Sequence, residues 1–273
     1  MSGAPAALLA SLLWGTADFL AGRASRIHPA ALVAFVGQAI GLAVLALVLA
    51  VRGFDADALL PGALSGLVGA VAVLAFYRAL ALGTMSIVAP IAATSAIVPV
   101  FAGVIDGERP GTLQWVGVAV ALIGVVLASI EPHGGSGATD SRAALKLALL
   151  AALGIGFALV FLGAAADHDA LTGVTAARAV TVPILAVIVF KTAARAPLRS
   201  LPGLAVIGLL DTGANTAFAI ATTAGLLSLV AVLGGLFPVV TVALAYVLLH
   251  ERLQPVQRAG VVLALSGIPL IST

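Results

Sequence analysis

Apolar runs of about 20 residues, the length that a membrane-crossing helix needs, follow one another along almost the whole chain. Hydrophobic residues make up 62% of the sequence and charged residues only 9%. A soluble protein needs roughly 25% charged residues to cover its surface, so most of this surface must face lipid. The sequence therefore predicts an all-α integral membrane protein.

Charges and clusters of Pro, Gly and Asp divide the sequence into ten such runs. The predicted spans are 4–22, 30–51, 62–81, 85–105, 112–130, 143–165, 170–190, 203–222, 226–248 and 255–272. The longest link is polar and rich in Gly, and it falls near the midpoint of the chain. We therefore expect two five-helix units, 1–131 and 143–273, joined by a linker at 132–142.

The two predicted units repeat each other. Sliding the chain against itself by 140 to 143 residues gives a collinear series of matches. These include Gln38 on Arg178, Gly83 and Ser86 on Gly225 and Ser228, and Glu108-Arg109 on Glu251-Arg252. Because five spans is an odd number, the second unit enters the membrane from the opposite face. Such inverted repeats predict a site near the midplane and transport by alternating access.

The segments Ala79–Ser129 and Ala221–Ser272 resemble the two EamA repeats of the drug/metabolite transporter superfamily. The shared features are a Gly-x-x-Ser entry into the fourth and ninth spans, a closing Glu-Arg, a Gln and a Gly-rich last helix. The resemblance implies a ten-helix transporter, typically an exporter of amino acids or other small metabolites in the bacterial inner membrane. One departure is Ser95, which stands where the second repeat has Pro238.

An ionisable side chain at membrane depth is costly and indicates a functional site. Arg178 and the equivalent Gln38 lie about nine residues inside their spans, which is about 13 Å deep. The Arg178 guanidinium suits a carboxylate of the substrate. The alternatives are a structural ion pair with Asp211 or Asp18, or a side chain that snorkels to the interface.

Other candidate substrate-binding residues share helix faces. Asp211 and Asn215 are one turn apart, with Phe218 on the same stripe, and they suit an ammonium group or an interhelical hydrogen bond. Trp14 and Asp18 are also one turn apart, although Asp18 could pair with Arg23 or Arg26 at the helix end. Asp18 and Asp211 are possible ion-coupling residues.

Further candidates lie at the ends of predicted spans. Tyr77, beside Phe76 and Arg78 at the end of the third span, fits an interfacial aromatic belt or a gate. Glu108-Arg109 and Glu251-Arg252 are interpreted as helix caps or local ion pairs.

Signatures of other functions are missing from the sequence. It has no Cys, no Gly-rich phosphate loop, no HExxH and no GxSxG, so we expect no metal, no cofactor and no enzymatic activity. An aspartyl dyad of Asp18 and Asp211 lacks the expected glycine setting. The leading hypothesis is a secondary exporter of amino acids, with export of lipophilic cations or another metabolite as the alternative. Nucleic acid is not an expected partner, and one chain with both repeats need not dimerise.

Two arguments disagree on the membrane orientation. Lys and Arg concentrate in the links after odd-numbered spans: Arg23, Arg26, Arg142, Lys146, Lys191, Arg195, Arg199, Arg252 and Arg258. The links after even-numbered spans hold only Arg52 and Arg109. The positive-inside rule then places both termini outside. The family resemblance implies the reverse.

Overall fold

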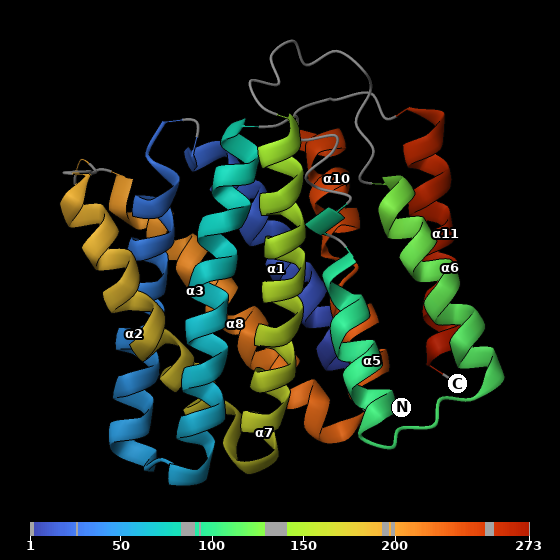
Figure 1. Ribbon diagram of the computed structural model, residues 1–273, viewed down its shortest axis with the longest axis horizontal. Helices are drawn as coiled ribbons and strands as arrows, with labels where there is room; N and C mark the ends of the chain where they lie inside the picture. The colour runs from blue at the N-terminus through green and yellow to red at the C-terminus, as the bar shows by residue number, and fades with distance from the viewer. Residues whose placement is uncertain are drawn as a thin grey trace.

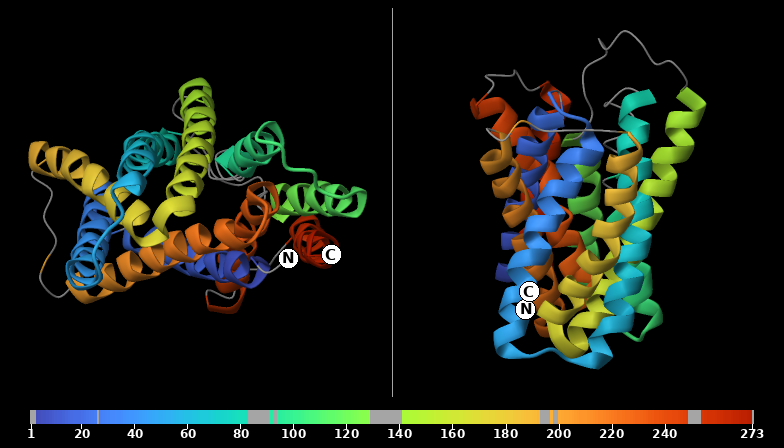
Figure 2. Two further views of the ribbon diagram at one scale, coloured as in Figure 1. Left: turned by 90° about the horizontal axis from the view of Figure 1, so that it is seen from below. Right: turned by 90° about the vertical axis from the view of Figure 1, so that its left-hand side faces the viewer.

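The computed structural model describes residues 3–25, 27–82, 91–92, 94–128, 141–192, 197, 200–248 and 254–272. All regular secondary structure in these residues is helical. The helices run along a common direction and form one bundle (Figure 1). The two chain ends lie toward the same end of this bundle (Figure 2), which we call the termini end.

The described helices follow the order of the predicted spans. The first half of the chain contains α1 (Ala4–Ser25), α2 (Ala30–Arg52), η1 (Ala56–Ala58), α3 (Leu59–Leu82), η2 (Thr94–Ala96), α5 (Ile97–Ile105) and α6 (Thr112–Ala128). The second half contains α7 (Ser141–Lys191), α8 (Leu201–Ala224), α9 (Leu227–Gly234), α10 (Phe237–Leu248) and α11 (Pro255–Ile271).

Six helical stretches are long and apolar enough to cross a membrane by length and composition. They are Ala4–Ser25, Ala30–Arg52, Ala56–Phe76, Leu145–Lys191, Leu201–Ala224 and Leu227–Leu248. Three shorter apolar helices are Thr94–Ile105, Thr112–Ala128 and Pro255–Ile271. The predicted all-helical, multi-pass membrane fold is therefore confirmed, with six candidate spans in the described residues. Part of the predicted span 85–105 lies outside those residues.

The sixth and seventh predicted helices are separated in the structure by a single non-helical residue, Asp169, at the end of the predicted link 166–169. They form α7 and meet at a kink where Asp169 has an extended backbone (φ −156°, ψ 113°). The Asp169 carboxylate accepts a hydrogen bond from the Thr172 backbone N–H at 2.7 Å. This is the geometry of a helix N-cap, so a single residue ends one helical run and begins the next.

The predicted ninth span is broken into α9 and α10. The break falls at Gly235 and Leu236, and Pro238 follows in the first turn of α10. Proline has no backbone N–H to donate, which is harmless in the first turn of a helix but breaks a helix interior. The Gly-Gly-Leu-Phe-Pro sequence therefore explains why one apolar run becomes two helices.

Close approaches between the two halves of the chain recur in exchanged pairs. A Cβ added at one member of each pair would contact or overlap the other member. The pairs are Gly37–Gly208 and Gly66–Ala177, Gly124–Ala264 and Gly267–Ala121, and Gly15–Val240 and Gly156–Val98. In every case the second pair is the first one shifted by the sequence repeat, with the halves interchanged. Each half therefore presents the same surface to the other, as subunits do in an isologous dimer.

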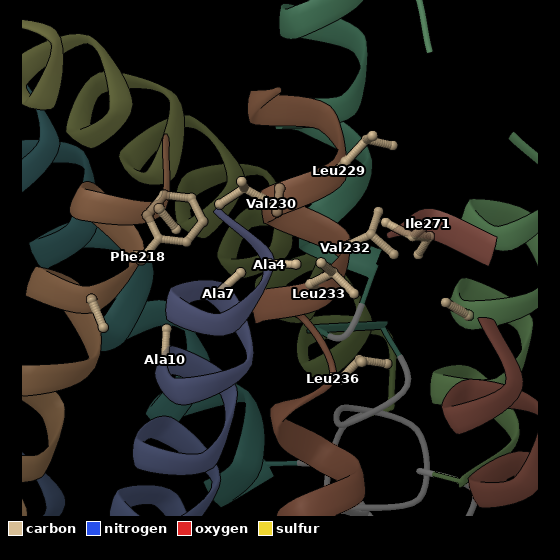
Figure 3. Close-up of a cluster of buried hydrophobic side chains, with 14 of the residues drawn as sticks. Ala4, Ala7, Ala10, Phe218, Leu229, Val230, Val232, Leu233, Leu236 and Ile271 are labelled. Carbon is tan, nitrogen blue, oxygen red and sulfur yellow. The ribbon is translucent and has the colours of Figure 1, made fainter. Parts of the chain in front are cut away.

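The main hydrophobic core surrounds α9. Residues 228–234 of this short helix are all buried, and Leu229, Val230 and Leu233 belong to the same buried cluster as small α1 residues such as Ala7 and Ala10 (Figure 3). Helix α9 contacts both α1 and α5, and small residues permit such close helix packing in membrane proteins. By contrast, α6 packs chiefly against α11 at the edge of the bundle (Figure 1).

Candidate functional site

An ion pair joins two adjacent helices inside the bundle. The Arg178 Nη2 of α7 donates a hydrogen bond to the Asp211 Oδ2 of α8 at 2.5 Å. The side chain of Arg178 is only 7% exposed, whereas that of Asp211 is 32% exposed. The structure thus forms the pair that the sequence allowed, and Asp211 remains partly accessible.

Asn215 holds the Asp211 carboxylate from one turn further along α8. Its Nδ2 donates to the Asp211 backbone oxygen at 2.7 Å and to the Asp211 Oδ1 at 3.3 Å. The two carboxylate oxygens therefore have different partners, Arg178 on one and Asn215 on the other. This arrangement fixes the carboxylate on the helix face that the sequence spacing predicted.

Four polar side-chain atoms of the described structure are buried without a hydrogen-bond partner: Gln38 Oε1, Arg178 Nε, Thr212 Oγ1 and Ser228 Oγ. The Gln38 Oε1 is an acceptor on α2, and the Arg178 Nε is a donor on α7. An unsatisfied buried polar group costs free energy comparable to a lost hydrogen bond. Gln38 and Arg178 are equivalent positions of the repeat, and their helices pack against each other. Both side chains retain hydrogen-bonding capacity for a polar ligand.

Asp18 is the second carboxylate of the interior. It lies on α1, which packs against α8, and it is within electrostatic range of Asp211. Asp18 is exposed to solvent. Within the described residues, Arg23 forms no ion pair with Asp18, while Arg26 lies outside them.

Trp14 stands one turn before Asp18 on α1. Its ring lies 5.6 Å from that of Phe218 and 6.3 Å from that of Phe237, measured between centroids. Phe218 is fully buried in the core (Figure 3), so it supports Trp14 and is not itself accessible. Phe237 was not predicted as a site residue, although its place at the break between α9 and α10 was a usable signal.

The remaining predicted site residue, Tyr77, belongs to α3, but its side chain lies outside the described part of the structure. Its neighbour Arg78 is exposed near the end of α3. The interior site therefore draws its described members from α1, α2, α7 and α8.

A second ion pair, which the sequence did not indicate, lies at the termini end of the bundle. The Arg52 Nη2 donates to the Asp169 Oδ1 at 2.5 Å, and the Asp55 backbone N–H donates to the Thr172 Oγ1 at 3.2 Å. Partial burial raises the pKa of Asp169, but hydrogen bonds from Arg52 and Thr172 outweigh burial, and the pKa lies below its ordinary value of 3.8. The same bond raises the pKa of Arg52.

Glu108 provides another link between the halves. Its carboxylate accepts hydrogen bonds from the backbone N–H groups of Leu227 and Ser228, the latter at 2.9 Å. These are free N–H groups at the start of α9, where the helix dipole favours a negative charge. Glu108 is thus a helix cap, as its position at the end of a span suggested. The helix that it caps is α9, which belongs to the other half of the chain.

No group of three or more His, Cys, Asp or Glu side chains that could hold a metal ion occurs in the described residues. The arrangement is instead one of opposite charges held within helices that are apolar enough to cross a membrane. Fold and site together define a multi-pass membrane protein with a polar interior.

Comparison with known families identifies the family to which the chain belongs. The EamA-like transporter family matches residues 1–130 and again residues 142–273. The chain belongs to this family, and it is therefore a membrane transporter built from two repeats. The members of this family are transporters, not enzymes.

A solved structure described only as "Crystal structure of protein" has the same fold. The two sequences are 22% identical, and the alignment covers 98% of this chain and 96% of that chain, with a TM-score of 0.80. No protein of curated function matches the chain.

Proposed function

We propose that this protein is a secondary transporter that exports amino acids across the bacterial inner membrane. The observation that carries the proposal is the interior constellation of Arg178, Asp211 and Asn215. A cation and an anion side by side present complementary partners for both charged groups of a zwitterion, and the free Arg178 Nε and Gln38 Oε1 offer further hydrogen bonds.

Alternating access is the mechanism that the repeat favours. The exchanged contacts between the halves fit a pseudo-two-fold axis, and five spans in each repeat would place that axis in the membrane plane. In this arrangement ten helices cross the membrane, and the short helices α5, α6 and α11 join the six longer stretches. An inward and an outward state then arise when the two repeats exchange conformations around Arg178 and Asp211.

Energy for export would come from the substrate gradient or from an ion that binds Asp18 or Asp211. The proposed partners are a small-molecule substrate and the lipid bilayer. Both repeats lie in one chain, so a monomer holds every residue of the site. Organic cations are the second candidate substrate class, because Asp18 is an interior carboxylate with no ion-pair partner among the described residues.

The test is flux of labelled amino acids into liposomes that contain the purified protein. We expect uptake of at least one amino acid, and at least a tenfold loss of uptake in Arg178→Ala. Arg258→Ala is the matched control, because Arg258 is exposed on α11 and should leave uptake unchanged. Flux of organic cations but of no amino acid, or unchanged uptake in Arg178→Ala, would contradict the proposal.

A further inference from the structure

One carboxylate of the interior site is outside the ion pairs of the described residues. Arg178 and Asp211 neutralise each other in their ion pair. Asp18 adds a second carboxylate within electrostatic range of Asp211, and neither of the two ion pairs in the described residues includes it. Asp18 is therefore a carboxylate of this region that has no ion-pair partner in the described residues.

The position of Asp18 makes this unpaired carboxylate available to a ligand. Helix α1 packs along α8, so the Asp18 side chain belongs to the same interior region as the ion pair. Asp18 is exposed. It stands one helical turn beyond Trp14, whose ring contacts Phe218 of α8, so it lies toward the face of α1 that packs against α8.

A carboxylate at membrane depth needs a compensating charge. The two charged groups of an amino acid backbone match Arg178 and Asp211 and leave Asp18 unmatched. From this charge balance we infer that the transported amino acid has a cationic side chain, and that Asp18 is the residue that selects it. This inference rests on the proposed function and specifies its substrate class as basic amino acids.

Trp14 supports a cation at this place. It lies one helical turn from Asp18, and the face of an indole ring attracts ammonium and guanidinium groups. Phe218 and Phe237 hold the ring from two sides. The orientation of Trp14 is thus fixed before a ligand binds, which reduces the entropy that binding would cost.

The pairing of Arg178 also removes an objection to a cationic substrate. A free Arg178 guanidinium would repel a cation, and the sequence left its partner open. With Asp211 as that partner at 2.5 Å, the repulsion is compensated, and Asp18 determines the net charge of the site.

The test compares two probes, L-lysine and L-norleucine, in proteoliposomes. Norleucine has the carbon chain of lysine without its side-chain ammonium group. We expect uptake of lysine to exceed uptake of norleucine by at least tenfold in the wild-type protein. Equal uptake of the two probes, or preference for norleucine, would overturn the inference on Asp18 but leave the amino-acid proposal standing. Uptake of neither probe and of no other amino acid would overturn both.

Variants of Asp18 test whether this residue determines the preference for lysine over norleucine. In Asp18→Asn we expect the ratio of lysine uptake to norleucine uptake to fall at least tenfold, and in Asp18→Glu we expect this ratio to return toward the wild-type value. Asp57→Asn is the matched control, because Asp57 is exposed at the termini end of the bundle. A full lysine preference in Asp18→Asn would overturn the role of this residue.

Substrate binding can be measured without transport. This measurement also tests a variant that folds but no longer transports. The chain has two Trp residues, so Trp115→Phe leaves Trp14 as the sole indole. We expect lysine, but not norleucine, to change the Trp14 fluorescence in detergent, and Asp18→Asn to abolish the change. An equal response to both probes would contradict the inference.

Discussion

At the scale of single residues, the Arg178–Asp211 pair has two roles that experiments can separate. Replacing only Arg178 by Ala leaves a carboxylate without its partner inside the bundle. We expect this variant to lose about 2 kcal/mol of stability, less than the roughly 3–5 kcal/mol of a fully buried pair, because the Asp211 side chain is 32% exposed. Thermal unfolding in detergent measures the loss.

The double variant Arg178→Leu/Asp211→Leu distinguishes the substrate clamp from the structural pair. Removing both charges eliminates the unpaired carboxylate, so we expect the melting temperature to return to near the wild-type value. Transport should remain lost because the zwitterion has no partners. Wild-type transport in this double variant would show that the pair serves helix packing alone.

The pair at the termini end responds to pH in a direction that its pKa shift fixes. The pKa of Asp169 is lower in the folded protein than its ordinary value of 3.8, so the pair contributes stability above pH 3.8 and loses it as the pH falls through the lower folded value. We expect Arg52→Gln to melt below the wild type at pH 7.

The difference between Arg52→Gln and the wild type should shrink as the pH drops below 3.8. Melting curves over this pH range in low salt provide the measurement. A difference between the two proteins that does not change with pH would contradict an electrostatic role for Arg52.

At the scale of helices, Glu108 couples the end of α5 to the start of α9. Glu108→Gln keeps the shape of the side chain but removes the charge that the α9 dipole favours, and we expect it to cost about 1 kcal/mol. Gly103→Ala should cost about the same, because a Cβ there would overlap the carboxylate at the end of the flexible Glu108 side chain and displace it from the cap. Chemical unfolding followed by far-UV circular dichroism measures both.

The matched control for these variants is Asp106→Asn, which changes an exposed acid on the same turn and should have no comparable effect. If Glu108→Gln were as stable as wild type, the cap would contribute nothing to the junction of the halves.

The helices also show how much of the fold could be predicted from the sequence. Apolar periodicity predicted a helical membrane protein because a lipid environment leaves few alternatives for the backbone. The breaks were harder to predict. Asp169 ends one helix and caps the next within a single residue, whereas a composition pattern detects only longer polar links.

The candidate site was predictable in part for a similar reason. Arg178, Asp211 and Asn215 stood out as polar residues in apolar spans, and the spacing on α8 placed Asp211 beside Asn215. The sequence did not decide the partner of Arg178, because α7 and α8 approach through tertiary packing that no local pattern encodes. The Arg52–Asp169 pair joins residues 117 positions apart and had no local signal.

At the scale of the whole molecule, the charged side chains divide between the two ends of the bundle. The described residues of the termini end include six acids and two bases: Asp55, Asp57, Asp106, Glu108, Asp167, Asp169, Arg52 and Arg109. Toward the other end, the described helix ends contribute cations only: Arg23, Arg78, Lys146, Lys191 and Arg258. In the structure, as in the sequence, the cations therefore concentrate on the side of the membrane that is opposite to the two termini.

Because Lys and Arg concentrate on the cytoplasmic side of membrane proteins, the charge distribution predicts that both termini face the periplasm. Alkaline phosphatase, which is active only in the periplasm, should then be active when fused after Thr273. The control fusion after Lys191, at the opposite end of the bundle, should be inactive. The reverse pattern would follow the orientation that family resemblance implies, and it would place the Arg52–Asp169 pair on the cytoplasmic side. With the predicted orientation, that pair instead lies on the periplasmic side.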